Sequence, residues 1–196
     1  MSEAIQRGGA WSKNTQIVIQ DSVVDIIRSP SIFMELVSIL ALQPKKEKVP
    51  DDYQAYDIEG KIDYNDIIKH REKIESYYAY VSMIENAYQT LSETSVSARE
   101  TALNNINSCY KSCVGELLLI NKSLISGKDK TERGKIRNEL IRNNSDAIID
   151  SVIKHVQATC SKSLTSINYT IEEIENHSEL IVFHAFVECK VLEKPQ

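Results

Sequence analysis

Cysteine and histidine are the residue types in this 196-residue chain that could bind a metal ion. Cys109 and Cys113 lie four positions apart, a spacing at which one helix can present two thiolates to zinc. His155 and Cys160 follow on a later segment. The chain contains neither Cys-x2-Cys nor His-Glu-x-x-His, and Cys113 occupies an apolar position that suits a small hydrophobic residue. We therefore expect no metal site and no cofactor.

Motifs for nucleophilic catalysis and for phosphate binding are also missing from the sequence. There is no Gly-x-Ser-x-Gly, the turn that displays a catalytic serine. The six glycines form neither a Walker loop nor a dinucleotide-binding loop. The carboxylate pair Glu172-Glu173 falls in an expected first helical turn, where the helix dipole favours negative charge. These observations predict that the chain is not an enzyme.

A basic segment between Lys128 and Arg142 is the best candidate for binding nucleic acid. Basic residues at the start of a helix can contact a phosphate backbone, and the candidates are Lys130, Arg133, Lys135, Arg137 and Arg142. The same charges are also typical of a solvated helix face with pairs such as Glu132 and Lys135. The chain carries a net charge of −5, which disfavours a general polyanion binder. Nucleic-acid binding by a helical regulator is therefore our second hypothesis.

Two apolar seams with three–four spacing indicate the helices that must carry any binding surface. The downstream seam consists of Leu103, Ile106, Tyr110, Cys113, Leu117, Ile120 and Leu124. The upstream seam consists of Ile67, His70, Ile74, Tyr77, Val81, Ile84, Tyr88 and Leu91. Polar residues 92–97 separate the two seams. The pattern predicts a mainly α protein built on a long, coiled-coil-like antiparallel hairpin within a helical bundle.

The remaining segments predict further helices and two short strands. Pro30 is suited to the first turn of a helix that ends near Leu42, and its apolar composition predicts burial in the core or in a partner. Asp129 can cap a third long helix that reaches about Thr159. Residues 15–19 could form a short strand or the first turn of a helix that reaches Ile27. Residues 180–192 could form a strand or a buried helix, and their β-branched and aromatic side chains slightly favour a strand in part of the segment.

A charged linker bracketed by Pro44 and Pro50 divides the chain. We therefore predict an N-terminal arm over residues 1–50 and a helical coupling domain over residues 51–196. The sequence has no secretory signal and no apolar run long enough to span a membrane. Four cysteines without an extracellular context are expected to stay reduced, which predicts a cytoplasmic protein that makes no membrane contact.

Tyrosine is concentrated in one region, with seven of the nine tyrosines between residues 53 and 88. Tyrosine is favoured at protein interfaces because its ring can be buried while its hydroxyl stays hydrated. The predicted partner-facing residues are Ile32, Leu36, Tyr64, Asn65, Tyr77, Tyr78, Tyr80 and Phe186. Homodimerisation is also plausible, because seams with few polar residues do not specify one partner strongly.

Two segments together resemble a known family. Lys61-Ile62-Asp63-Tyr64-Asn65, followed by Tyr77-Tyr78, resembles the start of a helical module in bacterial ABC-three-component conflict systems. Residues 185–195 are similar to the tail of that module, roughly Ala-Phe-x-x-Cys-Lys-Ile-x-Glu-x-Pro. The similarity covers residues 58–113 and 181–195, and only about fifty residues precede it, too few for an effector domain.

The resemblance implies a role in phage or plasmid defence. Such systems pair an SMC- or ABC-like ATPase with accessory proteins and an effector, often a nuclease or other hydrolase. The module usually follows the effector and couples it to the other components. The expected function is therefore that of a non-catalytic coupling subunit with protein partners, and the resemblance transfers no catalytic residue to this chain.

Overall fold

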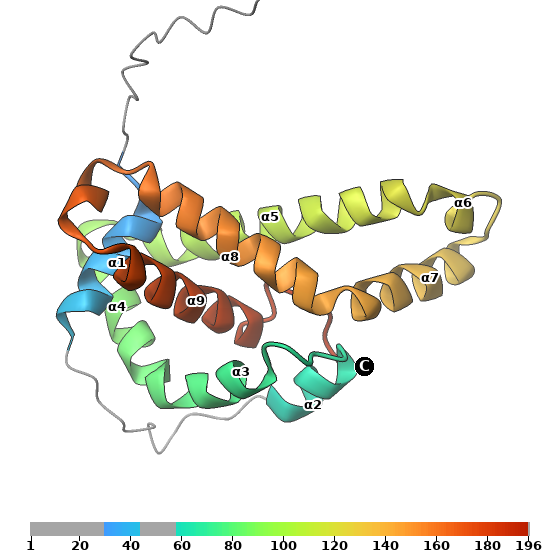
Figure 1. The fold of residues 1–196 in the computed structure, drawn as a ribbon, viewed down its shortest axis with the longest axis horizontal. Coiled ribbons are helices and arrows are strands. Elements are labelled where there is room, and N and C mark those ends of the chain that lie inside the picture. Colours follow the sequence, from blue (N-terminus) through green and yellow to red (C-terminus); the bar gives the residue numbers. More distant parts are fainter. Residues whose placement is uncertain (1–29, 44–57, 196) are drawn as a thin grey trace, which may run out of the picture.

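The computed structural model describes residues 30–43 and 58–195, and these residues are predominantly helical, with no β-strand among them (Figure 1). The prediction of a mainly α fold is therefore confirmed. The elements are α1 (Ile32–Leu42), α2 (Ile58–Tyr64), α3 (Arg71–Tyr77), the 3-10 turn η1 (Tyr78–Tyr80), α4 (Val81–Thr94), α5 (Ala98–Ile120), α6 (Lys122–Ile125), α7 (Lys130–Asn143), α8 (Ser145–Ser161), the 3-10 turn η2 (Leu164–Asn168) and α9 (Ile171–Val187).

Two helices begin at capping boxes. The Asp129 carboxylate accepts a hydrogen bond from the Glu132 backbone N–H at 2.8 Å, which starts α7 where the sequence predicted a helix. The Thr170 hydroxyl accepts one from the Glu173 N–H at 3.2 Å and starts α9. The predicted third long helix is divided, because α7 ends at Asn143 and α8 begins at Ser145.

The upstream half of the predicted hairpin is not one continuous helix. The chain turns between α2 and α3, where Asp66 adopts a left-handed conformation with φ of 52°. Asp146 at the start of α8 holds this turn, since its carboxylate accepts hydrogen bonds from three successive N–H groups, of Ile68, Lys69 and His70, at 3.0–3.2 Å. A distant acidic residue therefore fixes the loop that leads into α3, and no local pattern in the sequence reveals it.

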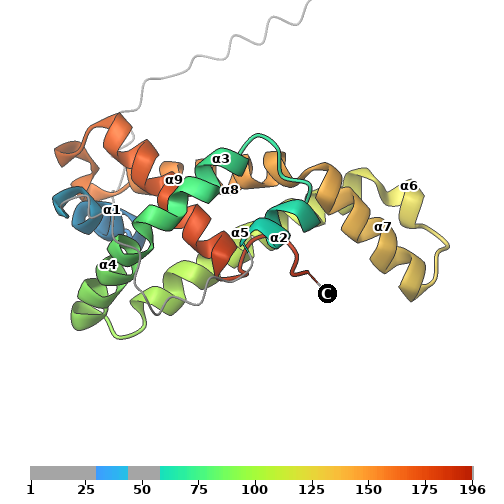
Figure 2. The ribbon, with the colours of Figure 1, turned by 90° about the horizontal axis from the view of Figure 1, so that it is seen from below.

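The predicted pairing of the two seams is not confirmed. Residues of the upstream seam are all buried, but α5 contacts α4 only in part and runs mainly antiparallel to α8 and α7 (Figures 1 and 2). The downstream seam is buried at Leu103, Ile106 and Tyr110, and becomes exposed at Ile120 and Leu124. The spacing thus identified the inward face correctly for most positions, whereas α8 is the main neighbour of α5.

Helix α9 lies at the centre of the fold. It packs against α1, α4 and α8, and every residue from Ile181 to Val187 is buried (Figure 2). The C-terminal strand that we expected in 180–192 is not confirmed, because residues 180–187 continue this helix. Burial on all sides favours β-branched and aromatic residues whatever their secondary structure, and this overrides their strand preference. The N-terminal strand predicted at 15–19 lies outside the described residues.

Helix α1 shares this core. Phe33, Met34, Leu36, Val37 and Leu40 are each at most 1% exposed and pack against α4, α8 and α9. The expected burial of this apolar helix is confirmed, and it is buried within the chain. The predicted linker after α1 lies outside the described residues, and the division at residue 50 stays a prediction. None of the described helices is both long and apolar enough to cross a membrane.

Candidate functional site

The two sequence segments that carry the family resemblance meet in space and hold the C-terminal tail beside α2 (Figure 1). The Lys61 ammonium donates a hydrogen bond to the Phe186 carbonyl, and it lies 4.2 Å from the centre of the Phe186 ring. The Asn65 amide donates to the Glu193 carbonyl at 2.9 Å and accepts from the Glu193 N–H at 3.1 Å. We name these contacts the tail clamp, and they connect residues more than 120 positions apart.

The Glu193 side chain extends the tail clamp to α5 and α7. Its carboxylate accepts a hydrogen bond from the Tyr110 hydroxyl at 2.6 Å and pairs with Arg137 at 3.0 Å. Burial alone would raise the pKa of Glu193, but these hydrogen bonds and the Arg137 charge hold it below its ordinary value. The carboxylate therefore stays ionised at neutral pH and joins three parts of the fold.

Backbone strain marks the same tail. Cys189 and Leu192 adopt left-handed conformations with φ of 57° and 60°, which disfavour residues other than glycine. Each such residue costs on the order of 1–3 kcal/mol and persists only where its surroundings enforce it. The Asn107 amide, which donates to the Lys190 carbonyl at 2.7 Å, contributes to that enforcement. The tail clamp thus attaches the C-terminal tail to the helical body through hydrogen bonds.

Burial separates the predicted partner-facing residues into two groups. Leu36, Asn65, Tyr77 and Phe186 are completely buried inside the chain, where they pack against its own helices. Ile32, Tyr64, Tyr78 and Tyr80 are half-buried. In this structure the first group serves the core and the tail clamp, and only the second group reaches the surface.

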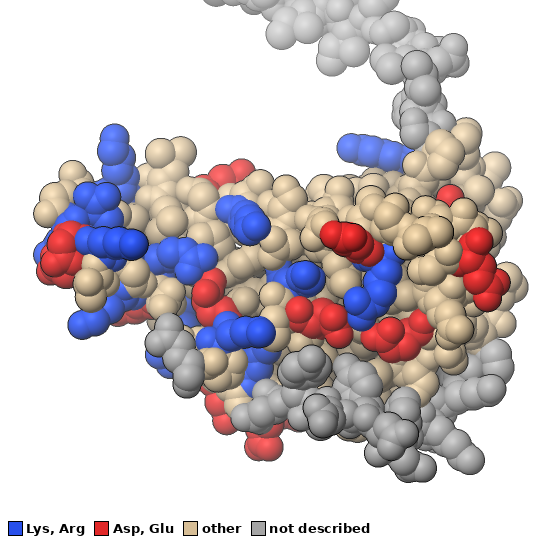
Figure 3. All heavy atoms as spheres, turned by 180° about the vertical axis from the view of Figure 1, so that it is seen from behind, with Lys and Arg blue, Asp and Glu red and all other residues tan. Residues whose placement is uncertain are grey.

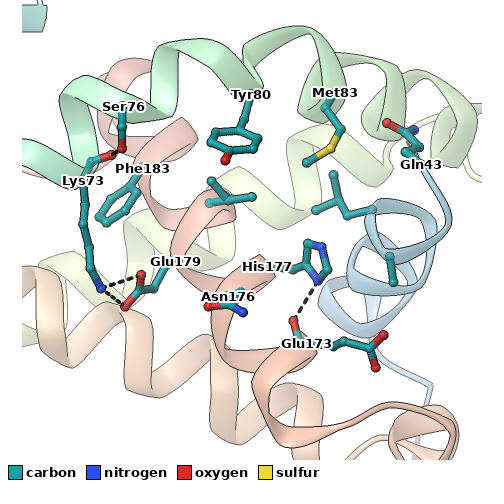
Figure 4. Close-up of a pocket in the computed structure, with 13 residues that line it drawn as sticks. Gln43, Lys73, Ser76, Tyr80, Met83, Glu173, Asn176, His177, Glu179 and Phe183 are labelled. Carbon is teal, nitrogen blue, oxygen red and sulfur yellow. Dashed lines mark hydrogen bonds and ion pairs between the residues drawn. The ribbon is translucent and has the colours of Figure 1, made fainter. Parts of the chain in front are cut away.

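Tyr80 lines a cavity of about 540 Å³ between the end of α1 and helices α3, α4 and α9 (Figure 4). Two side chains on its wall form an ion pair, and a third is bonded to the backbone. Lys73 contacts the Glu179 carboxylate at 2.8 Å, and His177 Nδ1–H donates to the Glu173 carbonyl at 2.7 Å.

The far end of α5, together with α6 and α7, presents apolar and basic side chains to solvent. Leu119, Ile120 and Leu124 are 71%, 81% and 50% exposed. Eight basic and four acidic residues occupy positions 111–142, and blue side chains gather at this end of the molecule in Figure 3. We name Leu119, Ile120 and Leu124 the distal patch. It lies at the end of the downstream seam, and Ile120 and Leu124 are the last two residues of that seam.

The predicted nucleic-acid residues surround this end but are not equally available. Arg137 pairs with Glu193 at 3.0 Å and Arg142 with Asp66 at 2.8 Å, so both serve contacts within the chain. Lys130, Arg133 and Lys135 are exposed. Arg133 Nε donates to the Lys128 carbonyl, whereas Lys130 and Lys135 form no ion pair within the part of the chain that the structure describes.

The tail clamp fixes the C-terminal tail to the helical body. The distal patch exposes apolar side chains, a feature typical of protein interaction sites. Residues 33–118, somewhat less than half of the chain, match the family model of C-terminal domain 10 of the ABC-three component (ABC-3C) systems. The resemblance predicted from the two sequence segments is thereby confirmed. The match runs from α1 into α5, so it begins earlier than we predicted and does not include the tail segment. No curated protein and no solved structure matches the chain.

Sequence reasoning missed several residues that the structure brings into these sites. Asp146, Asn107 and Tyr110 each complete a contact with a segment far away along the chain. Asn107 and Tyr110 lie three apart on α5, which is the only local signal that they share a face. Their partners could not be found from spacing.

Proposed function

We propose that this chain is a non-catalytic assembly module of an ABC-three-component defence complex. In that role it joins an effector, such as a nuclease or another hydrolase, to an SMC- or ABC-type ATPase. The family match supports the kind of complex. The observation that carries the proposal is the distal patch, where an apolar seam continues beyond the helices that cover its first half.

The distal patch supports docking through both its shape and its charge. Exposed apolar residues with charged residues around them, here at the end of α5 and on α6, are typical of protein interaction sites. Covering a Leu or Ile side chain completely contributes about 1.5–3 kcal/mol, so three such residues can decide whether a complex forms. The surrounding excess of basic residues favours an acidic surface on the partner.

Co-expression with the proteins encoded beside this chain tests the proposal. We expect a stable complex with the ATPase, the effector or both, measured as molar mass by light scattering. The double substitution Leu119→Asp with Ile120→Asp should abolish that complex while the chain keeps its helical circular dichroism. Ile171→Asp is the matched control, because Ile171 is 71% exposed and begins α9 at the opposite end of the molecule (Figure 1).

Three results would contradict the docking role of the distal patch. One is a complex that survives the double substitution. Another is a complex that the Ile171→Asp control also abolishes. The third is a homodimer, formed by the chain alone, that the double substitution dissociates, because a second copy would then be the partner of this surface.

The exposed basic residues of α7 support a second candidate function, binding of DNA or RNA. Lys130, Arg133 and Lys135 could contact phosphates, and such binding weakens steeply as salt is raised. Replacing Arg133 and Lys135 with Glu should then abolish a mobility shift of duplex DNA. Unchanged binding by that variant would exclude this surface.

A further inference from the structure

Two acidic side chains and a histidine converge between α4 and the end of α9, and Glu85 lies about a hundred positions before the other two. Glu85 lies on α4, His184 on the last turn of α9, and Glu188 directly after that helix. One potential ligand atom from each lies within 4.8 Å of the other two. Both carboxylates are partly exposed, whereas the His184 side chain is completely buried.

The His184 ring is satisfied on one side only. Its Nδ1 lies 2.7 Å from the Tyr77 hydroxyl, a good hydrogen bond. Its Nε2 has no hydrogen-bond partner among the described residues. The nearest carboxylate atom, Glu85 Oε1, lies at 3.6 Å, which is too long for a hydrogen bond. A buried polar atom without a partner is destabilising, so this arrangement calls for an explanation.

The 3.6 Å separation matches that of two atoms that share a metal ion. Nitrogen and oxygen ligands lie about 2.0–2.2 Å from zinc, which places two ligands of a tetrahedral site about 3.4 Å apart. We propose that Glu85, His184 and Glu188 form a site for a divalent transition-metal ion, with Zn²⁺ as the best fit to one imidazole and two carboxylates. Water on the exposed side of the carboxylates would complete the coordination.

The neighbours of His184 support this role. When Nδ1–H donates to the Tyr77 oxygen, the lone pair of Nε2 faces the two carboxylates, as a metal ligand requires. Burial, reinforced by the nearby Arg99 charge, lowers the pKa of His184 to about 3. The imidazole is therefore neutral at physiological pH, and protons do not compete with the ion there.

Arg99 on α5 is the present counter-ion of the site. Its guanidinium lies 3.3 Å from both the Glu85 and Glu188 carboxylates and 5.6 Å from the centre of the Tyr88 ring. The side chain is 38% exposed, so it can move outward when a metal ion takes over the neutralisation of the carboxylates. Because Arg99 and the ion compete for the same charges, removal of Arg99 should tighten metal binding.

Calorimetric titration of the chelator-treated full chain with Zn²⁺ tests the site. We expect one bound ion per chain and a raised thermal midpoint. Glu85→Gln and Glu188→Gln keep the side-chain shape and should each weaken binding by about tenfold or more. Glu179→Gln is the matched control on α9, since Glu179 pairs with Lys73 away from the site. Arg99→Gln should bind Zn²⁺ more tightly than the unmodified chain.

The cysteines are the competing explanation for any zinc that binds. Co²⁺ distinguishes the two, because a thiolate ligand gives an intense charge-transfer band that imidazole and carboxylate ligands do not. We expect no such band, and unchanged affinity in a Cys109→Ser, Cys113→Ser variant.

Several outcomes overturn the metal site. These are the absence of stoichiometric binding, affinity insensitive to both glutamine substitutions, a thiolate band, or Arg99→Gln binding no more tightly. The Arg99→Gln result decides the matter if a glutamine variant fails to fold. None of these outcomes depends on the assembly role, because they are measured on the isolated chain.

Discussion

Burial of His184 makes the stability of this fold sensitive to mild acid. The unfolded chain binds a proton at this residue near its ordinary pKa of 6.5, whereas the folded chain does so only at about 3. Between these values the unfolded state binds more protons, so stability falls as pH falls. Burial is the main cause, and the adjacent positive charge of Arg99 acts in the same direction, although the carboxylates of Glu85 and Glu188 also face the ring.

The expected loss is about 1.4 kcal/mol for each pH unit below the unfolded pKa, or about 2.7 kcal/mol at about pH 4.5. This is a large part of the about 5–15 kcal/mol that stabilises a typical domain. Measurements above about pH 4.5 separate the effect of His184 from the effect of the carboxylates. Carboxylates with lowered pKa values, such as Glu193 and Asp150, lose their contribution only at lower pH.

Urea unfolding at several pH values, with chelator present, measures this effect. His184→Asn keeps a hydrogen-bonding atom near Tyr77 and should reduce stability at neutral pH, but it should flatten the dependence on pH between about 6.5 and about 4.5. The control is His155→Asn, because His155 is exposed and bonded only to Asn105 at 3.0 Å, and its pH profile should match the unmodified chain. Equal slopes for His184→Asn and the unmodified chain would refute the reasoning.

Four further substitutions test individual parts of the fold, three by urea unfolding and one by proteolysis. Asp146→Ala removes the acceptor of three N–H groups and should cost about 1–3 kcal/mol, and a cost near zero would show that the turn needs no cap. Glu193→Ala should free the tail, seen as faster proteolytic cleavage near the C-terminus, and it should lose the contact with Tyr110. Leu103→Ala should cost about 2–5 kcal/mol and Leu119→Ala less than about 0.5, and similar costs would contradict the seam's change from buried to exposed.

Periodicity predicted the inward faces of the helices well. Every residue of the upstream seam is buried, although the helix that carries it is broken, because three–four spacing is preserved within each piece. The break itself depends on Asp66 in a left-handed conformation and on the hydrogen bonds from the following loop to Asp146, a contact over 76–78 positions. Helix pairing is decided by such distant contacts, which explains why local spacing did not reveal α8 as the main neighbour of α5.

The candidate sites were predictable in part. The segments 61–65 and 185–195 stood out in the sequence, but their mutual contact through Lys61 and Phe186 emerges only in three dimensions. His184 and Glu188 lie four positions apart, but Glu85 precedes them by about a hundred positions, so the full Glu85, His184 and Glu188 cluster has no sequence signature. Sequence spacing detects metal sites within one helix or turn, and this site is assembled from two helices.

The molar mass of the co-expressed complex tests the central proposal most directly. The assembly role predicts a stable species containing this chain and the neighbouring ATPase or effector, lost in the Leu119→Asp, Ile120→Asp variant and retained in Ile171→Asp. A chain that stays alone in the presence of those proteins, with its helical circular dichroism intact, would contradict the account.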